Sequence, residues 1–260
     1  MVGVCWASIA VGFDVSQAAE GVSYGPRPES PADWRALAER GVRTVLGVDG
    51  LPPDLELAEQ HGLGVFHVPL GYDGVDREDQ LALTAAARGA ARPLYVFCHH
   101  GKHRGPAAAA IVCRAVGLLD ATAATELLRE AGTSPDYPGL WRDVASFTPP
   151  PDDAPLPSLV TASETSPLAL AMTQLDRGLD AYRKATDVEM REASLVTIRE
   201  ALRESRRAAL TANAAVDLLS QLDTATAMAK ALSDAPSPDR SIEIQLGQSC
   251  VACHATHRDN

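Results

Sequence analysis

The chain has 260 residues, of which 46% are hydrophobic and 22% are charged, and its formal net charge is −11. This composition is typical of a globular protein with one or two domains, and the excess of negative charge argues against nucleic acid or an anionic membrane as a partner. No apolar run approaches the roughly 18 residues that a membrane span needs, so no transmembrane segment is predicted.

Residues 1–19 are predicted to be a signal segment or a disordered one. The first 13 residues are apolar, and Ser16-Gln17-Ala18 offers small residues for cleavage by a signal peptidase. The basic start that is expected of a signal peptide is missing, so a buried first strand is the alternative interpretation. Cys5 in this segment stands alone, outside any cysteine motif.

Strands and helices are predicted to alternate from residue 20 to residue 147. Ser30 is a typical N-cap, because a proline and then a carboxylate follow it at the first and third helical positions. Residues 94–98 (LYVFC) are apolar throughout, which indicates a strand buried on both faces. The pattern predicts an α/β domain, with helices flanking a parallel central sheet. Strands are expected at 22–28, 43–48, 64–68 and 94–98, and helices at 31–40, 53–60, 77–88, 106–118 and within 121–147.

Residues 148–166 contain five prolines and little periodicity, and they are predicted to form a semi-rigid linker. From residue 167 to residue 260 the pattern is helical. Helices are expected to begin at Pro167, Val188, Ala212 and Asp239. Four helices with short connections predict an all-α, antiparallel four-helix bundle.

One loop in the first domain carries a cysteine and an arginine at its two ends, between a predicted strand and a predicted helix. Backbone N–H groups of such a loop, together with the helix N-terminus, form a cradle for an anion and favour the thiolate of the cysteine. The arginine can grip two phosphate oxygens. This arrangement suits cleavage of a phosphate ester through a phosphocysteine. The segment reads Cys98-His99-His100-Gly101-Lys102-His103-Arg104 and is followed by Gly105.

Residues 22–147 resemble the cysteine-dependent protein tyrosine phosphatases of the dual-specificity type. The resemblance lies in the order of elements and in GVRTVLGV, GVFHVPL and VFCHHGKHRG. It implies that Cys98 is the nucleophile, that Arg104 clamps the phosphate and that residues 99–103 and Gly105 form the phosphate-binding loop. It also implies that an aspartate, Asp73 or alternatively Asp76, protonates the leaving oxygen and then activates water.

Two positions depart from the usual pattern of that family. Phe97 stands where a histidine is usual, and Gly105 stands where a serine or threonine is usual. These departures predict slower turnover, or an anion-binding domain without hydrolysis. Sulfur transfer of the rhodanese type and arsenate reduction stay open, because both use a cysteine in an oxyanion cradle. Cys113 is expected to be a small buried residue, with a role as resolving thiol as the alternative.

The segment Cys250-Val251-Ala252-Cys253-His254 has the C-x-x-C-H pattern of a c-type haem attachment site. Two thiols at this spacing can reach the two vinyl groups of one haem, and the histidine can bind its iron. Residues 167–260 contain one aromatic residue, Tyr182, so a buried haem would help to fill this core. A zinc site is the alternative, with His257 as a further ligand.

Residues 167–260 resemble cytochrome c′ and its c556-type relatives, because CVACHATHR stands at the end of the last predicted helix. His257 takes the place of the family's usual aromatic residue, and Arg258 that of its basic residue. The resemblance implies one covalent haem c on Cys250 and Cys253, with His254 as iron ligand. Met172 is either the sixth ligand or a core residue.

The sequence as a whole predicts a bifunctional, extracytoplasmic or periplasmic protein, because haem attachment normally happens outside the cytoplasm. The first domain would act on a phosphorylated or other oxyanion substrate. The second would serve electron transfer with a redox partner protein, or redox or gas sensing. The alternatives are an electron-transfer cytochrome with an inactive pseudophosphatase domain, and sulfur or arsenic redox chemistry at Cys98.

Overall fold

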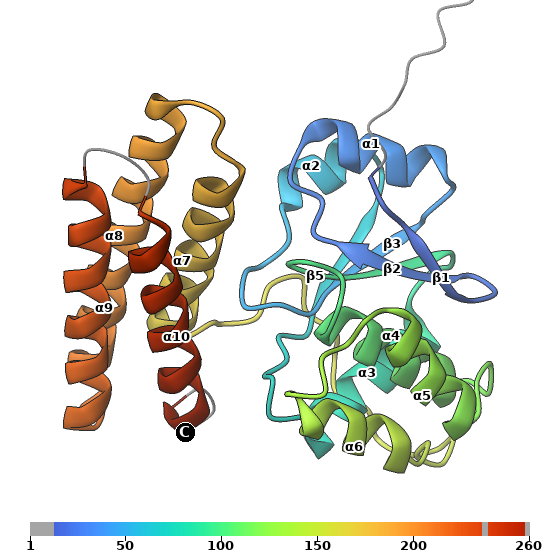
Figure 1. Cartoon of the computed structure of the whole chain (residues 1–260). Coiled ribbons are helices and arrows are strands. Elements are labelled where there is room, and N and C mark those ends of the chain that lie inside the picture. Colours follow the sequence, from blue (N-terminus) through green and yellow to red (C-terminus); the bar gives the residue numbers. More distant parts are fainter. Residues whose placement is uncertain (1–12, 236–238, 258–260) are drawn as a thin grey trace, which may run out of the picture. The chain divides into compact units, whose positions relative to one another are not determined.

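The computed structural model describes residues 13–235 and 239–257 (Figure 1). Predictions for Cys5, Arg258 and most of the possible signal segment therefore lie outside the described residues. The chain divides into two compact units, with the boundary between Ser163 and Glu164.

The first unit is built on a sheet of five strands in the described part of the chain. Its spatial order is β1-β2-β5-β3-β4, so the strand that ends at Cys98 is central. β2, β5, β3 and β4 are parallel, as predicted. The strands are β1 (Ser16–Ala19), β2 (Val22–Pro26), β3 (Thr44–Gly47), β4 (Gly64–His67) and β5 (Leu94–Cys98).

Strand β1 differs from the predicted parallel arrangement, because it pairs antiparallel with β2 and makes the sheet mixed. The two strands are joined at Glu20 and Gly21, and Gly21 has a φ of +71°, a conformation that favours glycine. The small and polar side chains of β1 carry no strand pattern, which is why residues 16–18 resemble a signal-peptidase cleavage site in sequence. Ser16, Gln17 and Ala19 pair with Tyr24, Ser23 and Val22.

Helices cover both faces of the sheet (Figure 1). One face carries α1 (Pro31–Glu39) and α2 (Leu55–Gln60). The other carries α3 (Arg77–Gly89), α4 (Arg104–Ala115), α5 (Ala121–Glu130) and α6 (Pro138–Ser146). The predicted N-cap of the first helix is confirmed, since the Ser30 side chain accepts the N–H of Asp33. The helix ends at Glu39, and Gly41 follows its C-cap, Arg40, with a φ of +79°.

Strand β5 contributes to both hydrophobic cores, and all five of its residues are buried. Leu94, Val96 and Cys98 pack with α3 to α6. Tyr95 and Phe97 pack with α1 and α2 on the opposite face. The alternation follows from the period of two in a β-strand, and it turns Cys98 toward the face that carries α4.

A buried ion pair joins the chain just after β2 to the chain just after β3. Arg27 Nε donates to Asp49 Oδ2 over 3.1 Å, and Arg27 Nη2 donates to the other carboxylate oxygen. The Arg27 guanidinium carbon lies 4.9 Å from the centre of the Phe97 ring. Because β5 lies between β2 and β3, this pair spans the end of the central strand beside Cys98.

Part of the proline-rich segment predicted as a linker is hydrogen-bonded to the first unit. Arg88 donates to the carbonyl oxygens of Pro150 and Pro151 at 2.7 and 3.1 Å. The N–H of His67, on β4, donates to Val160 O at 2.9 Å, and the N–H of Ser163 donates to His67 Nδ1 at 3.1 Å. The unit therefore extends to Ser163, well beyond the expected end at residue 147.

The second unit consists of helices α7 (Pro167–Lys184), α8 (Val188–Thr211), α9 (Val216–Asp234) and α10 (Arg240–His257) in its described residues. The helix beginning expected at Ala212 lies instead at Val216, because Asn213 adopts a φ of +52° between α8 and α9. One hydrophobic cluster draws on all these helices, for example through Leu175, Ile198, Leu222 and Leu246. Every helix of the described chain is too short or too polar to act as a membrane-spanning segment.

Replacing Asp49 with alanine should strongly destabilise the first unit. Asp49 is fully buried, and its loss leaves the buried Arg27 charge without its partner. Removing one partner of a buried pair costs about 3–5 kcal/mol of the free energy of unfolding, which urea unfolding would measure. The control is Asp152→Ala, which removes an exposed partner of Arg88 and should leave the midpoint unchanged. An equal, small effect of both substitutions would contradict the structural role of the pair.

His67 should make stability depend on pH. Its Nδ1 accepts the N–H of Ser163, so the neutral ring donates from Nε2 to Asp49 O at 2.8 Å. Burial lowers the pKa of His67 from its usual 6.5, so the unfolded chain takes up the proton more readily. The contribution of His67 to the free energy of unfolding is therefore complete above that value and falls as pH drops below about 6.5.

We expect His67→Gln to flatten this pH dependence, measured as the difference in urea midpoint between variant and wild type from pH 8 to pH 5. His61→Gln is the matched control, since His61 is a half-buried histidine of the same unit. A constant difference across this range would show that His67 does not carry the effect.

Candidate functional site

Cys98 lies at the carboxyl end of β5, and a loop of five residues leads from it to Arg104, the first residue of α4. The cysteine is buried, with 3% of its surface exposed. The predicted strand, loop and helix are therefore present around the cysteine and the arginine. The helix begins two residues earlier than expected, at Arg104 rather than Pro106.

Carbonyl groups of this loop are bound to the surrounding scaffold. Cys98 O accepts the N–H of Gly101 at 3.2 Å, and His99 O accepts the N–H of Arg27 at 3.3 Å. Lys102 O accepts the hydroxyl of Thr133 at 2.7 Å. In a trans peptide the N–H points opposite to the C=O. The N–H groups that follow His99 and Lys102 therefore point away from those partners, as an anion cradle requires.

Gly101 is needed for the loop to lie close to β2. Its φ is +69°, and a Cβ at this position would stand 2.3 Å from the carbonyl carbon of Gly25. A side chain here would push the loop off the end of β2. This close approach fixes the loop at the level of Cys98, since Pro26 is the residue that pairs with Cys98 in the sheet.

Arg104 is half-buried, and the loop that precedes α3 holds its outer end. Nη2 donates to the Tyr72 hydroxyl at 3.0 Å, and Nη1 donates to Leu70 O at 3.4 Å. Nε is buried and has no acceptor among the described residues. Burial opposes the charge, but the neighbouring Tyr72 and Cys98 outweigh it and raise the pKa of Arg104 above its usual value. The guanidinium is therefore charged, and its Nε–H can donate to a ligand.

The histidines and the lysine of the loop have different surroundings. His100 and Lys102 are exposed, and His99 is half-buried with its ring 4.2 Å from that of His100. His103 Nδ1 accepts the N–H of Ser134 at 3.3 Å. Lys102 places an exposed positive charge beside the loop, which suits an anionic ligand.

The two residues that depart from the family pattern, Phe97 and Gly105, have different surroundings. Phe97 is fully buried beneath the Arg27 guanidinium, and a Cβ at Gly47 would stand 2.9 Å from its ring. It serves packing, while backbone contacts hold the loop. Gly105 lies against the thiol, because a Cβ there would stand 3.4 Å from Cys98 Sγ. The hydroxyl that is usual in the family is thus missing beside the sulfur.

The two candidates for the general acid have different surroundings. Asp76 is the N-cap of α3, and its Oδ1 accepts the N–H of Asp79 at 2.9 Å. Asp73 is exposed. Its backbone is fixed by α6, because a Cβ at Gly139 would stand only 1.4 Å from Asp73 O. The Asp76 carboxylate therefore has a structural role as a helix cap, a role that the Asp73 carboxylate does not have.

Sequence reasoning missed several residues of this region. Arg27 and Asp49 follow parallel strands at their carboxyl ends, and that position was an available signal. Asp79 has its pKa raised to about 7 by burial and then by the nearby carboxylates of Asp76 and Glu78. Tyr72 had no signal beyond its place next to Asp73. Cys113 is buried on α4, and burial raises its pKa to about 12, as expected for a packed thiol.

In the second unit, α10 carries Cys250, Cys253 and His254. The two cysteines are one helical turn apart, and both pack on the hydrophobic cluster, as does Met172 from α7. Burial raises the pKa of both thiols, with further contributions from Cys253 on Cys250 and from Asp217 on Cys253. Two adjacent thiols and a following histidine on a helix that faces an apolar cluster are a donor set that fits a covalent haem.

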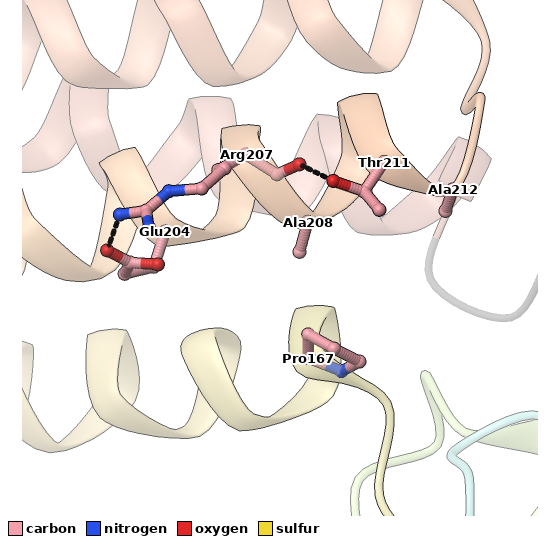
Figure 2. A pocket seen from close by; sticks show the side chains of 6 residues that line it. All are labelled: Pro167, Glu204, Arg207, Ala208, Thr211 and Ala212. Atoms are coloured by element: carbon pink, nitrogen blue, oxygen red, sulfur yellow. Dashed lines mark hydrogen bonds and ion pairs between the residues drawn. The ribbon is translucent and has the colours of Figure 1, made fainter.

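Two other features of the second unit lie apart from this motif. His257 Nε2 is 3.2 Å from Asp217 Oδ2, so the ligand proposed for a zinc alternative already has a carboxylate partner. Among the described residues of this unit, no three His, Cys, Asp or Glu ligand atoms gather within 4.8 Å. A groove beside the Glu204–Arg207 ion pair is lined by Pro167, Glu204, Arg207, Ala208, Thr211 and Ala212 (Figure 2).

No known family model matches the sequence, and no curated protein does. Solved structures of cysteine-based phosphatases resemble about half of the chain. The catalytic core of the PP-IP phosphatase Siw14 from S. cerevisiae is 14% identical, with a TM-score of 0.45, over 52% of this chain and 85% of that chain. A Shewanella putrefaciens CN-32 protein, described as a candidate phosphatase of DUF442, is 19% identical, with a TM-score of 0.40, over 51% and 91%. Tk-PTP is 18% identical, with a TM-score of 0.38, over 54% and 98%.

At these identities and TM-scores the likeness concerns the outline of the fold. It says nothing about substrate or turnover in this chain.

Proposed function

We propose that the first unit is a cysteine-dependent phosphatase with Cys98 as its nucleophile. The observation that carries the proposal is the buried Nε of Arg104, which lacks an acceptor at the end of a loop that begins with a buried cysteine. A phosphoryl group in the cradle would accept this N–H and the inward N–H groups of the loop. It would then lie against Cys98 Sγ.

The proposed reaction has two steps. In the first, the Cys98 thiolate forms a bond to phosphorus while the bond from phosphorus to the leaving oxygen breaks, and Asp73 gives its proton to that oxygen. In the second, water attacks the phosphocysteine, Asp73 takes a proton from the water, and the P–S bond breaks to return the thiolate and release phosphate. Arg104 would neutralise the charge on the transferred oxygens in both steps.

Gly105 favours a second candidate, an anion-binding domain with little or no hydrolysis. Because no hydroxyl stands beside Sγ, the departing thiolate of the second step lacks that hydrogen bond. Sulfur transfer or arsenate reduction would use the same cradle and the same thiolate. The substrate that is turned over distinguishes these reactions from phosphate-ester hydrolysis.

We further propose that the second unit binds one c-type haem. Cys250 and Cys253 would hold it by thioether links, His254 would bind its iron, and Met172 is the candidate for a second protein ligand of the iron. When bound, the haem would supply one-electron redox chemistry or a binding site for a diatomic gas. A redox partner protein and an extracytoplasmic location belong to this proposal. The whole chain would then join phosphate-ester hydrolysis to a redox or sensing role.

Cys98→Ser should abolish hydrolysis of p-nitrophenyl phosphate, because the hydroxyl is not ionised in the cradle at neutral pH. We expect a fall of at least about a thousandfold in kcat, measured by release of p-nitrophenol. Cys113→Ala, which removes the other thiol of the described first unit, should stay within about threefold of wild type. Activity that survives Cys98→Ser would reject the phosphatase proposal, and turnover of thiosulfate or arsenate in its place would favour the alternatives.

Gly105→Ser should speed the second step. The new Cβ would stand 3.3 Å from Cys98 N and 3.4 Å from Sγ, so a shift of a few tenths of an ångström accommodates it, and its hydroxyl can donate to the departing thiolate. We expect wild type to release a burst of one p-nitrophenol per site and then turn over slowly. The variant should show the same burst rate and a steady-state rate about tenfold higher, as one hydrogen bond to a charged group would give. A wild type without a burst would place the slow step before the phosphocysteine.

Expression with a haem-maturation system should give a covalent haem that survives denaturing electrophoresis. Cys250→Ala and Cys253→Ala should each weaken the attachment, and the double variant should abolish it. Met172→Ala should shift the spectrum from low spin to high spin if Met172 is the sixth ligand. An unchanged spectrum would leave Met172 as a core residue, and full haem retention in the double cysteine variant would reject the haem proposal.

A further inference from the structure

Tyr72 makes two different contacts with the proposed phosphate clamp. Its hydroxyl accepts a hydrogen bond from Arg104 Nη2 at 3.0 Å, and its ring centre lies 4.1 Å from the guanidinium carbon. Both contacts restrict the orientation of the guanidinium plane. The hydrogen bond fixes the direction of an Nη2–H, and the ring packs against the face of the guanidinium. With Leu70 O on Nη1, the loop preceding α3 fixes the outer end of Arg104.

The contacts leave one edge of the guanidinium for a ligand. An arginine side chain has five N–H bonds in a planar fork. Tyr72 uses one of the two at Nη2, and Leu70 uses one at Nη1. The Nε–H is buried and has no acceptor among the described residues. In a guanidinium one of the two Nη2–H bonds is parallel to Nε–H. When Tyr72 accepts the other, this edge can donate to two oxygens of one oxyanion.

Tyr72 is itself held by α6. The centre of its ring lies 4.7 Å from that of Tyr137, the residue just before the first residue of α6. The next residue, Asp73, rests with its carbonyl oxygen against Gly139 in the first turn of that helix. Val75 then donates its N–H to Asp143 Oδ2 at 2.8 Å. Residues 137–143, in and just before α6, therefore contact three residues of the segment that carries Tyr72 and the candidate acid Asp73.

We propose that Tyr72 is a positioning residue for oxyanion binding, which orients Arg104 by its hydroxyl and its ring so that Nε and Nη2 face the anion. This inference rests on the proposed function of the loop. It also links the position of Arg104 to that of the candidate acid. Tyr72 contacts Arg104, and the next residue, Asp73, is the candidate acid. Tyr72 acts through Arg104 and is not itself placed in contact with the reacting atoms.

The test uses the full chain and tungstate, a stable oxyanion, as the probe in calorimetric binding. Tyr72→Phe keeps the ring and removes the hydroxyl, so tungstate should bind about tenfold more weakly. KM for p-nitrophenyl phosphate should rise by a similar factor, and kcat should stay within about twofold. Tyr182→Phe makes the same chemical change in the second unit and should leave tungstate affinity unchanged.

Repeating Tyr72→Phe in an Arg104→Lys background distinguishes an effect through Arg104 from a purely structural role of Tyr72. If Tyr72 acts through the guanidinium, Tyr72→Phe should change tungstate affinity by less than about twofold there, since the two effects are coupled. Equal losses in both backgrounds, or wild-type affinity in Tyr72→Phe, would overturn the inference. Thermal midpoints of all variants would show whether a loss of binding reflects unfolding.

The outcomes also separate this inference from the proposed function. If wild type binds tungstate but shows no Cys98-dependent hydrolysis, the phosphatase proposal fails and the binding comparison still decides the role of Tyr72. If wild type does not bind tungstate, the anion site and the inference fail together.

Discussion

The buried contact between Arg27 and Asp49 is the constraint on which the geometry of the first unit depends. The two residues follow β2 and β3, which are the neighbours of β5 on either side, so their pairing ties together the strands that enclose Cys98. The guanidinium lies over Phe97, and the N–H of Arg27 donates to His99 O in the loop. A charge pair removed from water is tolerated only when it is well hydrogen-bonded, and the Arg27 guanidinium also donates to Pro52 O at 3.1 Å and to Leu51 O.

Around that pair, the loop from Cys98 to Arg104 receives its shape from parts of the chain that are far apart in sequence. Gly25 supplies the backbone against which Gly101 packs, and Thr133 binds the carbonyl of Lys102. The scaffold therefore fixes the backbone of the loop, as the proposed binding of an anion there would require of a preorganised site. Gly105 takes no part in these contacts, so the missing hydroxyl does not affect the shape of the loop; it bears only on the departure of the sulfur in the proposed reaction.

Local patterns were enough to predict much of this fold. The apolar run 94–98 identified the central strand, Ser30-Pro31 identified a helix start, and the spacing of Cys98 and Arg104 placed the loop between strand and helix. The contacts of Tyr72 with Arg104 and of Arg27 with Asp49 join residues 32 and 22 positions apart, and no periodicity records such pairings. Strand β1 was missed because it is held by backbone pairing with β2 and has few large apolar side chains. The attachment of residues 150–163 was missed for a similar reason, since backbone atoms make most of its hydrogen bonds.

The segment that runs from Val160 to Ser163 has a further effect through its place beside β4. β4 is an outer strand of the sheet, and an outer strand offers unpaired N–H and C=O groups that can recruit a strand from another molecule. Val160 O accepts a hydrogen bond from the N–H of His67, and the Ser163 hydroxyl donates one to the carbonyl oxygen of His67. The chain that leaves the unit thus also shields its sheet from intermolecular pairing. A chain shortened before Val160 would expose that edge and with it a route to aggregation.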